Sequence, residues 1–156
     1  YNKAALNENK ISMLSEKVEK FSKEPLFSVF SIKDAKVLKS MGFDQVKIPS
    51  HEIANVDLHH YVADEFEKGF ISVGAGSSEE AVECISIYKK TNKDFNFMHC
   101  VSSYPCPEDK INLPRLGWLG KHTENLGFSD HTSSTIIPAL SLLYGVKVIE
   151  KHFLLN

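Results

Sequence analysis

Short apolar runs that end in polar residues alternate with longer stretches of helical period along this 156-residue chain. The runs that can form strands cover residues 25–31, 45–50, 69–74, 95–100, 126–130 and 146–153, and the helical stretches cover residues 33–41, 53–68, 77–91, 112–122 and 133–144. Another amphipathic helix is expected earlier, where Leu14, Val18 and Phe21 share a face. Ser77 and Glu80 have the spacing of a capping box. Because parallel neighbours need a crossover connection, the alternation predicts an α/β fold with a parallel sheet.

The length of the chain limits the kind of parallel sheet. Open doubly wound sheets and (β/α)8 barrels both place ligands at the carboxyl ends of the strands, where the polar residues of this chain gather. A complete barrel takes about 250 residues, so six units indicate either an open sheet or an incomplete (β/α)8 TIM barrel. The start in mid-helix without a methionine and the end at residues 152–156 favour the incomplete barrel.

Composition excludes several classes of function. The net charge of −2 and the lack of a basic run argue against nucleic acid as a partner. No apolar run reaches the roughly 18–20 residues of a membrane span, and no signal peptide opens the chain. Cys84, Cys100 and Cys106 form no CxxC pair, which is typical of reduced thiols in a cytoplasmic protein. No GxGxxG or GxxxxGK[ST] motif follows a strand, which disfavours nucleotide binding.

Groups with binding chemistry lie at or near the ends of the six expected strands. They are Ser28; Lys47, Ser50 and Glu52; Ser72; His99 and Ser102; Ser129, Asp130 and His131; and Glu150 and His152. Lysine and serine donors suit an oxyanion such as a phosphate or carboxylate. Two histidines on adjacent strands suit a divalent metal with open positions. One ion can join His131 and His152 only if their nearest ring nitrogens lie within about 8 Å.

Four stretches carry a resemblance to a known family. They are KIPSHEIAN at 47–55, HCVSSYPCPEDKINL at 99–113, GFSDHT at 127–132 and EKHF at 150–153. Together they resemble the signature stretches of the sialic acid synthase family, which includes N-acetylneuraminate, legionaminic acid and pseudaminic acid synthases. The resemblance implies a (β/α)8 catalytic barrel followed by a small antifreeze-like domain. Residues 1–156 would then be a partial barrel with strands three to eight, lacking the first two strands and the C-terminal domain.

The resemblance also implies roles for individual residues. Those that match contacts to phosphoenolpyruvate are Ser28, Lys47, Ser50, Ser72, Ser102 and Ser129. His131 and His152 match the protein ligands of a divalent metal, manganese or magnesium. Glu52 and Tyr104 match residues that face an amino-sugar substrate, so Glu52, Lys47 and Tyr104 are the expected catalytic residues. The stretches at 28–31 and 72–75 depart from the family pattern, which would alter the sugar pocket.

The implied activity is the condensation of phosphoenolpyruvate with an N-acetylmannosamine-type sugar, which gives a nonulosonic acid and phosphate. The full-length protein is expected to be a cytoplasmic homodimer. Two alternatives stay open: another phosphoenolpyruvate-dependent synthase that makes a seven- or eight-carbon sugar acid, and a non-catalytic sugar-binding barrel fragment. The remaining histidines are expected to be structural, namely His51, His59, His60 and His122.

Overall fold

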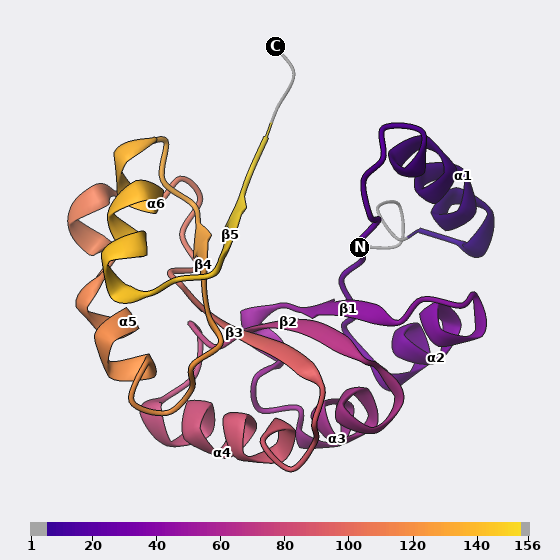
Figure 1. Ribbon diagram of the computed structural model, residues 1–156, viewed down its shortest axis with the longest axis horizontal. Coiled ribbons are helices and arrows are strands. Elements are labelled where there is room, and N and C mark those ends of the chain that lie inside the picture. The colour runs from indigo at the N-terminus through magenta and orange to yellow at the C-terminus, as the bar shows by residue number, and fades with distance from the viewer. Residues whose placement is uncertain (1–5, 154–156) are drawn as a thin grey trace.

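The computed structural model describes residues 6–153, in which five parallel strands form a curved sheet with helices around its outer side (Figure 1). The strands are β1 (Gln45–Ile48), β2 (Lys68–Ser72), β3 (Asp94–Cys100), β4 (Leu126–Asp130) and β5 (Val148–Lys151). The helices are α1 (Glu8–Glu19), α2 (Ile32–Ser40), α3 (Val56–Glu65), α4 (Ser78–Tyr88), α5 (Pro114–Leu119) and α6 (Ile136–Ser141), with 3-10 turns η1 (Ser50–Glu52), η2 (Glu108–Lys110) and η3 (Leu142–Tyr144). No helix within 6–153 has the length and apolar character to cross a membrane.

The strand order decides between the two kinds of parallel sheet. The strands lie in the order β1-β2-β3-β4-β5, and each neighbouring pair is parallel. A doubly wound sheet reverses direction at a switch point, whereas a barrel adds each strand beside the previous one. The predicted incomplete (β/α)8 barrel is therefore confirmed, and the open doubly wound sheet is excluded.

The first expected strand, over residues 25–31, is reduced to an isolated bridge between Ser28 and Lys47. The Val29 amide donates to the Lys47 carbonyl at 2.9 Å, and the Lys47 amide donates to the Phe27 carbonyl at 3.0 Å. This segment pairs with β1 on one side, and Pro25 has no amide proton to extend the ladder. The prediction of a full strand there was wrong because strand formation depends on partners as well as on an apolar run.

Helix ends follow local capping more closely than hydrophobic period. The predicted capping box is confirmed: Ser77 Oγ accepts from the Glu80 amide at 3.1 Å, and Glu80 Oε2 accepts from the Ser77 amide at 2.7 Å. The expected helix over 53–68 is shortened to α3 because η1 precedes it and Asn55 caps its start. Phe21 lies beyond the end of α1 and is 78% exposed, so the predicted apolar face of that helix was wrong there.

Alternation along the strands separates an apolar outer face from a polar inner face. The buried core between the sheet and its helices includes Val46 and Ile48 of β1, Ile71 of β2 and Phe128 of β4. Successive side chains of a strand point to opposite faces. Lys47 therefore faces the inside of the curve, and the same alternation places Ser72 and Ser129 there. The predicted site residues Lys47, Ser72 and Ser129 thus line the concave side.

His59 is a buried core residue, as expected for a structural histidine. Its Nδ1 pairs with the Tyr88 hydroxyl at 2.8 Å between α3 and α4, and burial lowers its pKa from 6.5 to about 4. Between these values the unfolded chain binds a proton that folded His59 does not, so the free energy of unfolding falls as the pH falls. We expect a loss of about 3 kcal/mol across that window.

Urea unfolding at several pH values checks this expectation. The full-length His59→Gln variant is expected to show a weaker pH dependence than the wild type between pH 6.5 and pH 4. His60→Gln is the matched control, because His60 is the exposed neighbour on the same helix. Equal slopes for the wild type and His59→Gln would contradict the assignment.

Gly74 follows β2 where the backbone of β3 approaches closely. A Cβ atom added at Gly74 would overlap the Cys100 carbonyl oxygen, which belongs to the backbone and cannot turn away. We expect Gly74→Ala to lower the free energy of unfolding by about 2 kcal/mol. In Gly117→Ala the new Cβ meets the Tyr144 ring at an ordinary 3.5 Å. That control should be neutral or stabilising because alanine favours a helix, and similar losses in both variants would refute the steric reason.

Candidate active site

The ammonium group of Lys47 stands at the centre of the concave side. Lys47 is 5% exposed. Its Nζ donates to Ser72 Oγ and to Glu150 Oε2, both at 2.7 Å, and lies 3.1 Å from Met98 Sδ. These partners come from β2, β5 and β3, so one cation joins four strands of the sheet. A buried lysine in such a position can bind an oxyanion as a point charge.

Glu150 is the counter-ion of Lys47. Burial alone would raise the pKa of the Glu150 carboxyl, but the Lys47 ammonium outweighs burial and holds that pKa below its usual range. The carboxyl group is therefore ionised at neutral pH. Its side chain is 42% exposed, whereas that of Lys47 is 6% exposed. The pair thus has one buried member and one member that reaches solvent.

Other predicted serines lie on the segments next to Lys47 or on the strand next to Glu150. Ser50, in η1, shares a hydrogen bond of 2.9 Å with Ser102, which follows β3. Ser129 Oγ lies 3.3 Å from His131 Nε2. Ser28 is exposed and reaches Lys47 through the backbone bridge. The expected phosphoenolpyruvate contacts thus all lie at the carboxyl ends of the strands or beside them.

His131 and His152 face each other at the ends of β4 and β5. Their ring centroids are 5.4 Å apart and the ring planes meet at 78°. Two imidazoles that share one ion through bonds of about 2.1 Å stand with ring centres roughly 5 Å apart. His131 Nδ1 lies 2.7 Å from the Val101 carbonyl, which can only accept, so Nδ1 carries the proton and Nε2 carries the lone pair, to which Ser129 Oγ can donate at 3.3 Å.

This tautomer is the one that a metal-binding histidine needs, because the outer hydrogen bond fixes the ring and directs the other nitrogen to the ion. The ring separation and the His131 tautomer are thus compatible with a shared divalent cation, which stays a prediction. Within residues 6–153, His, Cys, Asp and Glu side chains form no group of three or more that could hold a metal. His131 and His152 are thus the protein ligands that the described chain would offer.

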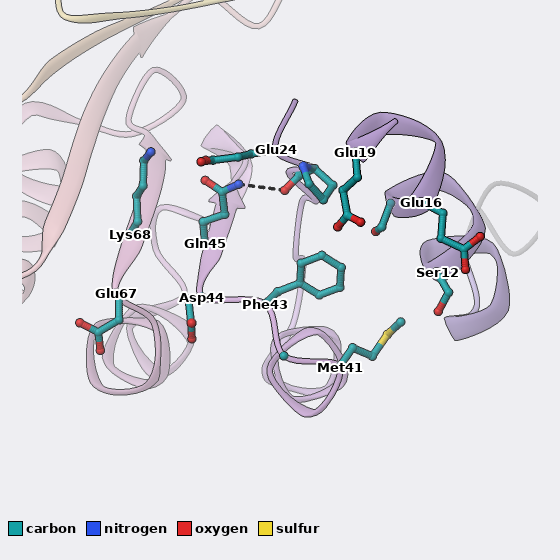
Figure 2. A pocket seen from close by; sticks show the side chains of 13 residues that line it. Ser12, Glu16, Glu19, Glu24, Met41, Phe43, Asp44, Gln45, Glu67 and Lys68 are labelled. Atoms are coloured by element: carbon teal, nitrogen blue, oxygen red, sulfur yellow. Dashed lines mark hydrogen bonds between the residues drawn. The ribbon is translucent and has the colours of Figure 1, made fainter. Parts of the chain in front are cut away.

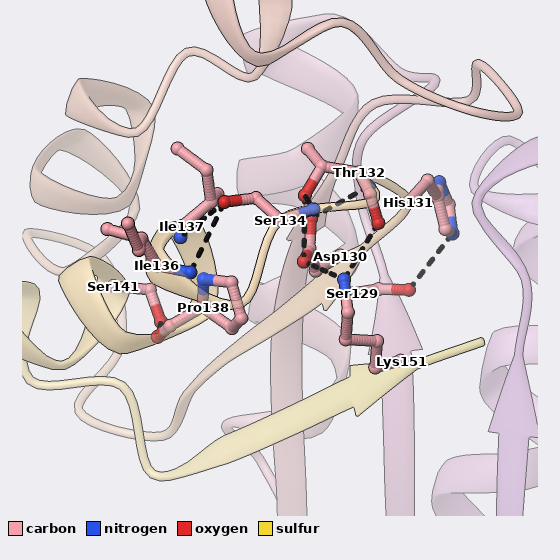
Figure 3. A network of polar contacts seen from close by, with 10 residues as sticks. All are labelled: Ser129, Asp130, His131, Thr132, Ser134, Ile136, Ile137, Pro138, Ser141 and Lys151. Carbon is pink, nitrogen blue, oxygen red and sulfur yellow. Dashed lines mark hydrogen bonds and ion pairs between the residues drawn. The ribbon is translucent and has the colours of Figure 1, made fainter. Parts of the chain in front are cut away.

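The residues directly before the two histidines form an ion pair, which holds the ends of β4 and β5 together and so brings the two rings close. Asp130 and Lys151 are register partners on β4 and β5, and Lys151 Nζ donates to Asp130 Oδ2 at 2.5 Å (Figure 3). Asp130 is fully buried and also accepts from the Thr132 amide at 2.9 Å. Lys151 donates further to the Thr132 carbonyl at 2.8 Å. The backbone on both sides of His131 is therefore held against the strand that carries His152.

Tyr104 covers the histidine pair. Its ring centroid lies 4.0 Å from that of His131 and 5.1 Å from that of His152. Burial raises the pKa of the Tyr104 phenol, and the Glu150 carboxylate raises it further, so the hydroxyl stays protonated at neutral pH. Tyr104 is still 63% exposed. It can therefore donate a hydrogen bond to a group that approaches from solvent.

Glu52 and His99 lie apart from the ion pair. Glu52 Oε2 accepts from Asn55 Nδ2 at 2.9 Å at the start of α3, and within residues 6–153 no hydrogen bond or ion pair joins it to Lys47, His131 or His152. His99 is buried on the outer face of β3, where Nε2 lies 2.8 Å from the Ile111 carbonyl and the ring stacks on Phe128. His99 thus anchors the loop after β3 from behind.

A hollow of about 620 Å³ lies elsewhere, between α1 and the starts of β1 and β2 (Figure 2). Its acidic lining includes Glu16, Glu19 and Glu24, with Asp44 and Glu67 near the strands. Parallel strands gather functional groups at their carboxyl ends, whereas this hollow is at the amino ends. It is not part of the candidate active site.

The whole chain matches a known protein family. A sequence profile described as the NeuB family matches residues 1–156, which is the whole chain. The chain belongs to the NeuB family. The resemblance found in the four signature stretches is thereby confirmed, and the site residues retain the roles expected of them as predictions.

The relatives of this NeuB chain include pseudaminic and legionaminic acid synthases. It is 34% identical over 131 residues to a pseudaminic acid synthase of Helicobacter pylori, covering 83% of this chain and 38% of the relative. It is 31% identical over 157 residues to an N,N'-diacetyllegionaminic acid synthase of Legionella pneumophila, covering 97% and 44%. A crystal structure of N-acetylneuraminic acid (sialic acid) synthetase from Leptospira borgpetersenii, in complex with citrate, superimposes with a TM-score of 0.89 at 33% identity. That match covers 98% of this chain and 54% of the other.

This NeuB chain thus spans about two-fifths to about half of the length of these relatives. One residue of its site had no role assigned from sequence. Glu150 was noted as a strand-end carboxylate, but its pairing with Lys47 spans 103 positions of sequence. The sequence gives one indication that Glu150 belongs to the site. Glu150 lies two residues before His152, and residues i and i+2 of a strand share a face.

Proposed function

We propose that the full-length protein condenses phosphoenolpyruvate with an N-acetylmannosamine-type amino sugar to form a nonulosonic acid and inorganic phosphate. The observation that carries the proposal is a buried lysine paired with Glu150, two residues before His152, which faces His131 in a NeuB-family barrel. The relatives named as pseudaminic and legionaminic acid synthases support the same class of product.

In this reaction Lys47 holds an oxyanion of phosphoenolpyruvate, with help from the hydroxyls of Ser50, Ser72 and Ser129. Fixing the substrate beside the aldehyde turns an encounter of two molecules into an oriented pair, which is a large part of the catalytic advantage. A divalent cation on His131 and His152 would supply Lewis-acid polarisation of a carbonyl oxygen when bound.

The bond changes are as follows. The C3 carbon of phosphoenolpyruvate attacks the aldehyde carbon of the sugar, and a carbon–carbon bond forms while the aldehyde oxygen takes a proton. Water adds to the cationic C2, and the C2–oxygen bond to phosphate then breaks. Tyr104 is placed to donate a hydrogen bond to the sugar, and Glu52 is the proposed acid or base on the sugar side. One phosphate leaves for each sugar acid formed.

A substrate panel tests this function. The full-length protein, supplied with manganese and phosphoenolpyruvate, should release phosphate with N-acetylmannosamine or a 2,4-diacetamido hexose and form an equal amount of sugar acid. A pentose phosphate should give no product. Turnover of the pentose phosphate alone would assign the protein to the eight-carbon synthases, turnover of a tetrose phosphate alone would assign it to the seven-carbon synthases, and sugar binding without turnover would identify a binding module.

A further inference from the structure

The ammonium group of Lys47 has no unused donor. It carries three N–H groups, and within the described chain its partners are Ser72 Oγ, Glu150 Oε2 and Met98 Sδ. A phosphate or carboxylate oxygen that binds Lys47 must therefore replace one of these three partners.

The three partners differ in their freedom to leave. Ser72 is 3% exposed and Met98 is 1% exposed, so both are fixed in the packed interior. The Glu150 side chain is 42% exposed and belongs to β5, which pairs with β4 alone among the described strands. Glu150 is also the only charged partner, so it would repel an incoming anion that shared the same ammonium group.

We propose that Glu150 occupies the anion site of Lys47 in the free protein, and that an oxyanion binds there by displacing the Glu150 carboxylate. Glu150 thereby sets the affinity of the site. The inference rests on the proposed function in one respect, since the anion in turnover is phosphoenolpyruvate. The exchange keeps the buried ammonium paired in both states, and an unpaired buried charge is strongly destabilising.

Inorganic phosphate is the probe, and the metal-free full-length protein is the material, so that no imidazole-bound ion contributes. Glu150→Gln removes the competing charge and retains the shape of the side chain. We expect this variant to lower the dissociation constant for phosphate about five- to tenfold in calorimetric titrations. Glu124→Gln makes the same charge change at an exposed position in the loop before β4 and should change the constant less than about twofold.

The gain must depend on Lys47. In a Lys47→Met background, Glu150→Gln should give no gain in phosphate affinity. An unchanged or weaker affinity in Glu150→Gln, or a gain that persists without Lys47, would overturn the inference. Far-UV circular dichroism verifies that each variant is folded.

A measurement on the wild type avoids dependence on any variant. In a crystal structure with phosphate bound at Lys47, the distance from Lys47 Nζ to Glu150 Oε2 should increase from 2.7 Å to beyond about 3.5 Å. Phosphate bound beside an intact ion pair would refute the displacement. Both measurements record binding without turnover, so a failure to condense phosphoenolpyruvate with a sugar would count against the proposed function alone.

Discussion

Replacing Lys47 with methionine is expected to lower kcat/KM of the full-length protein for phosphoenolpyruvate by about 10³-fold. Lys47 is the buried cation of the site, and the loss of one preorganised donor to a developing or bound anion costs about 10²–10³ in rate. The loss of ground-state binding to the substrate adds to this. Initial rates of phosphate release at saturating sugar measure the effect.

The design separates catalysis from folding. Methionine has nearly the volume of the lysine stem, and Glu150 reaches solvent when its partner is removed. Lys90→Met is the control, because Lys90 is an exposed lysine after α4. If the folded Lys47→Met protein retained more than about one-fifth of wild-type kcat/KM, Lys47 would not be the residue that binds the anion.

Loss of either imidazole of the facing pair has the second large effect. We expect His131→Ala and His152→Ala each to weaken manganese binding by at least about 100-fold and to reduce activity about 10³-fold. The reason is that one remaining imidazole cannot hold the ion in the position that the two rings define. Electron paramagnetic resonance of free manganese measures binding, and phosphate release measures activity.

His60→Ala serves as the control for this pair because His60 is exposed on α3. Treatment of the wild type with EDTA should abolish activity, and added manganese should restore it. Full activity after chelation, or manganese binding that survives both alanine substitutions, would show that the two histidines do not form the metal centre.

Much of the fold could be predicted because its signals are local. The apolar runs that became β1 to β5 and the helical periods between them were legible in short windows, and parallel order follows from the crossovers. The Ser77–Glu80 capping box involves residues three positions apart. The segment at 25–31 was mistaken for a full strand because its pairing depends on a neighbour that no local pattern reveals.

The sequence predicts which residues lie in the candidate site, but it does not predict most of the contacts between them. Strand ends and alternation place Lys47 and Ser72 on the concave side. The pairing of Lys47 with Glu150 crosses the inside of the curved sheet, and neither spacing nor period indicates it. The hydrogen bond from His131 to the Val101 carbonyl likewise depends on the path of a loop.

The central claim is a condensation in which phosphate leaves with the oxygen that joined it to C2. The direct measurement is the reaction of the full-length protein with phosphoenolpyruvate, an N-acetylmannosamine-type sugar and manganese in ¹⁸O-labelled water, followed by mass spectrometry of both products. The account predicts unlabelled phosphate in equal amount to a nine-carbon sugar acid. Labelled phosphate would show attack of water at phosphorus, and phosphate released without the sugar acid would show hydrolysis without condensation; either result would contradict it.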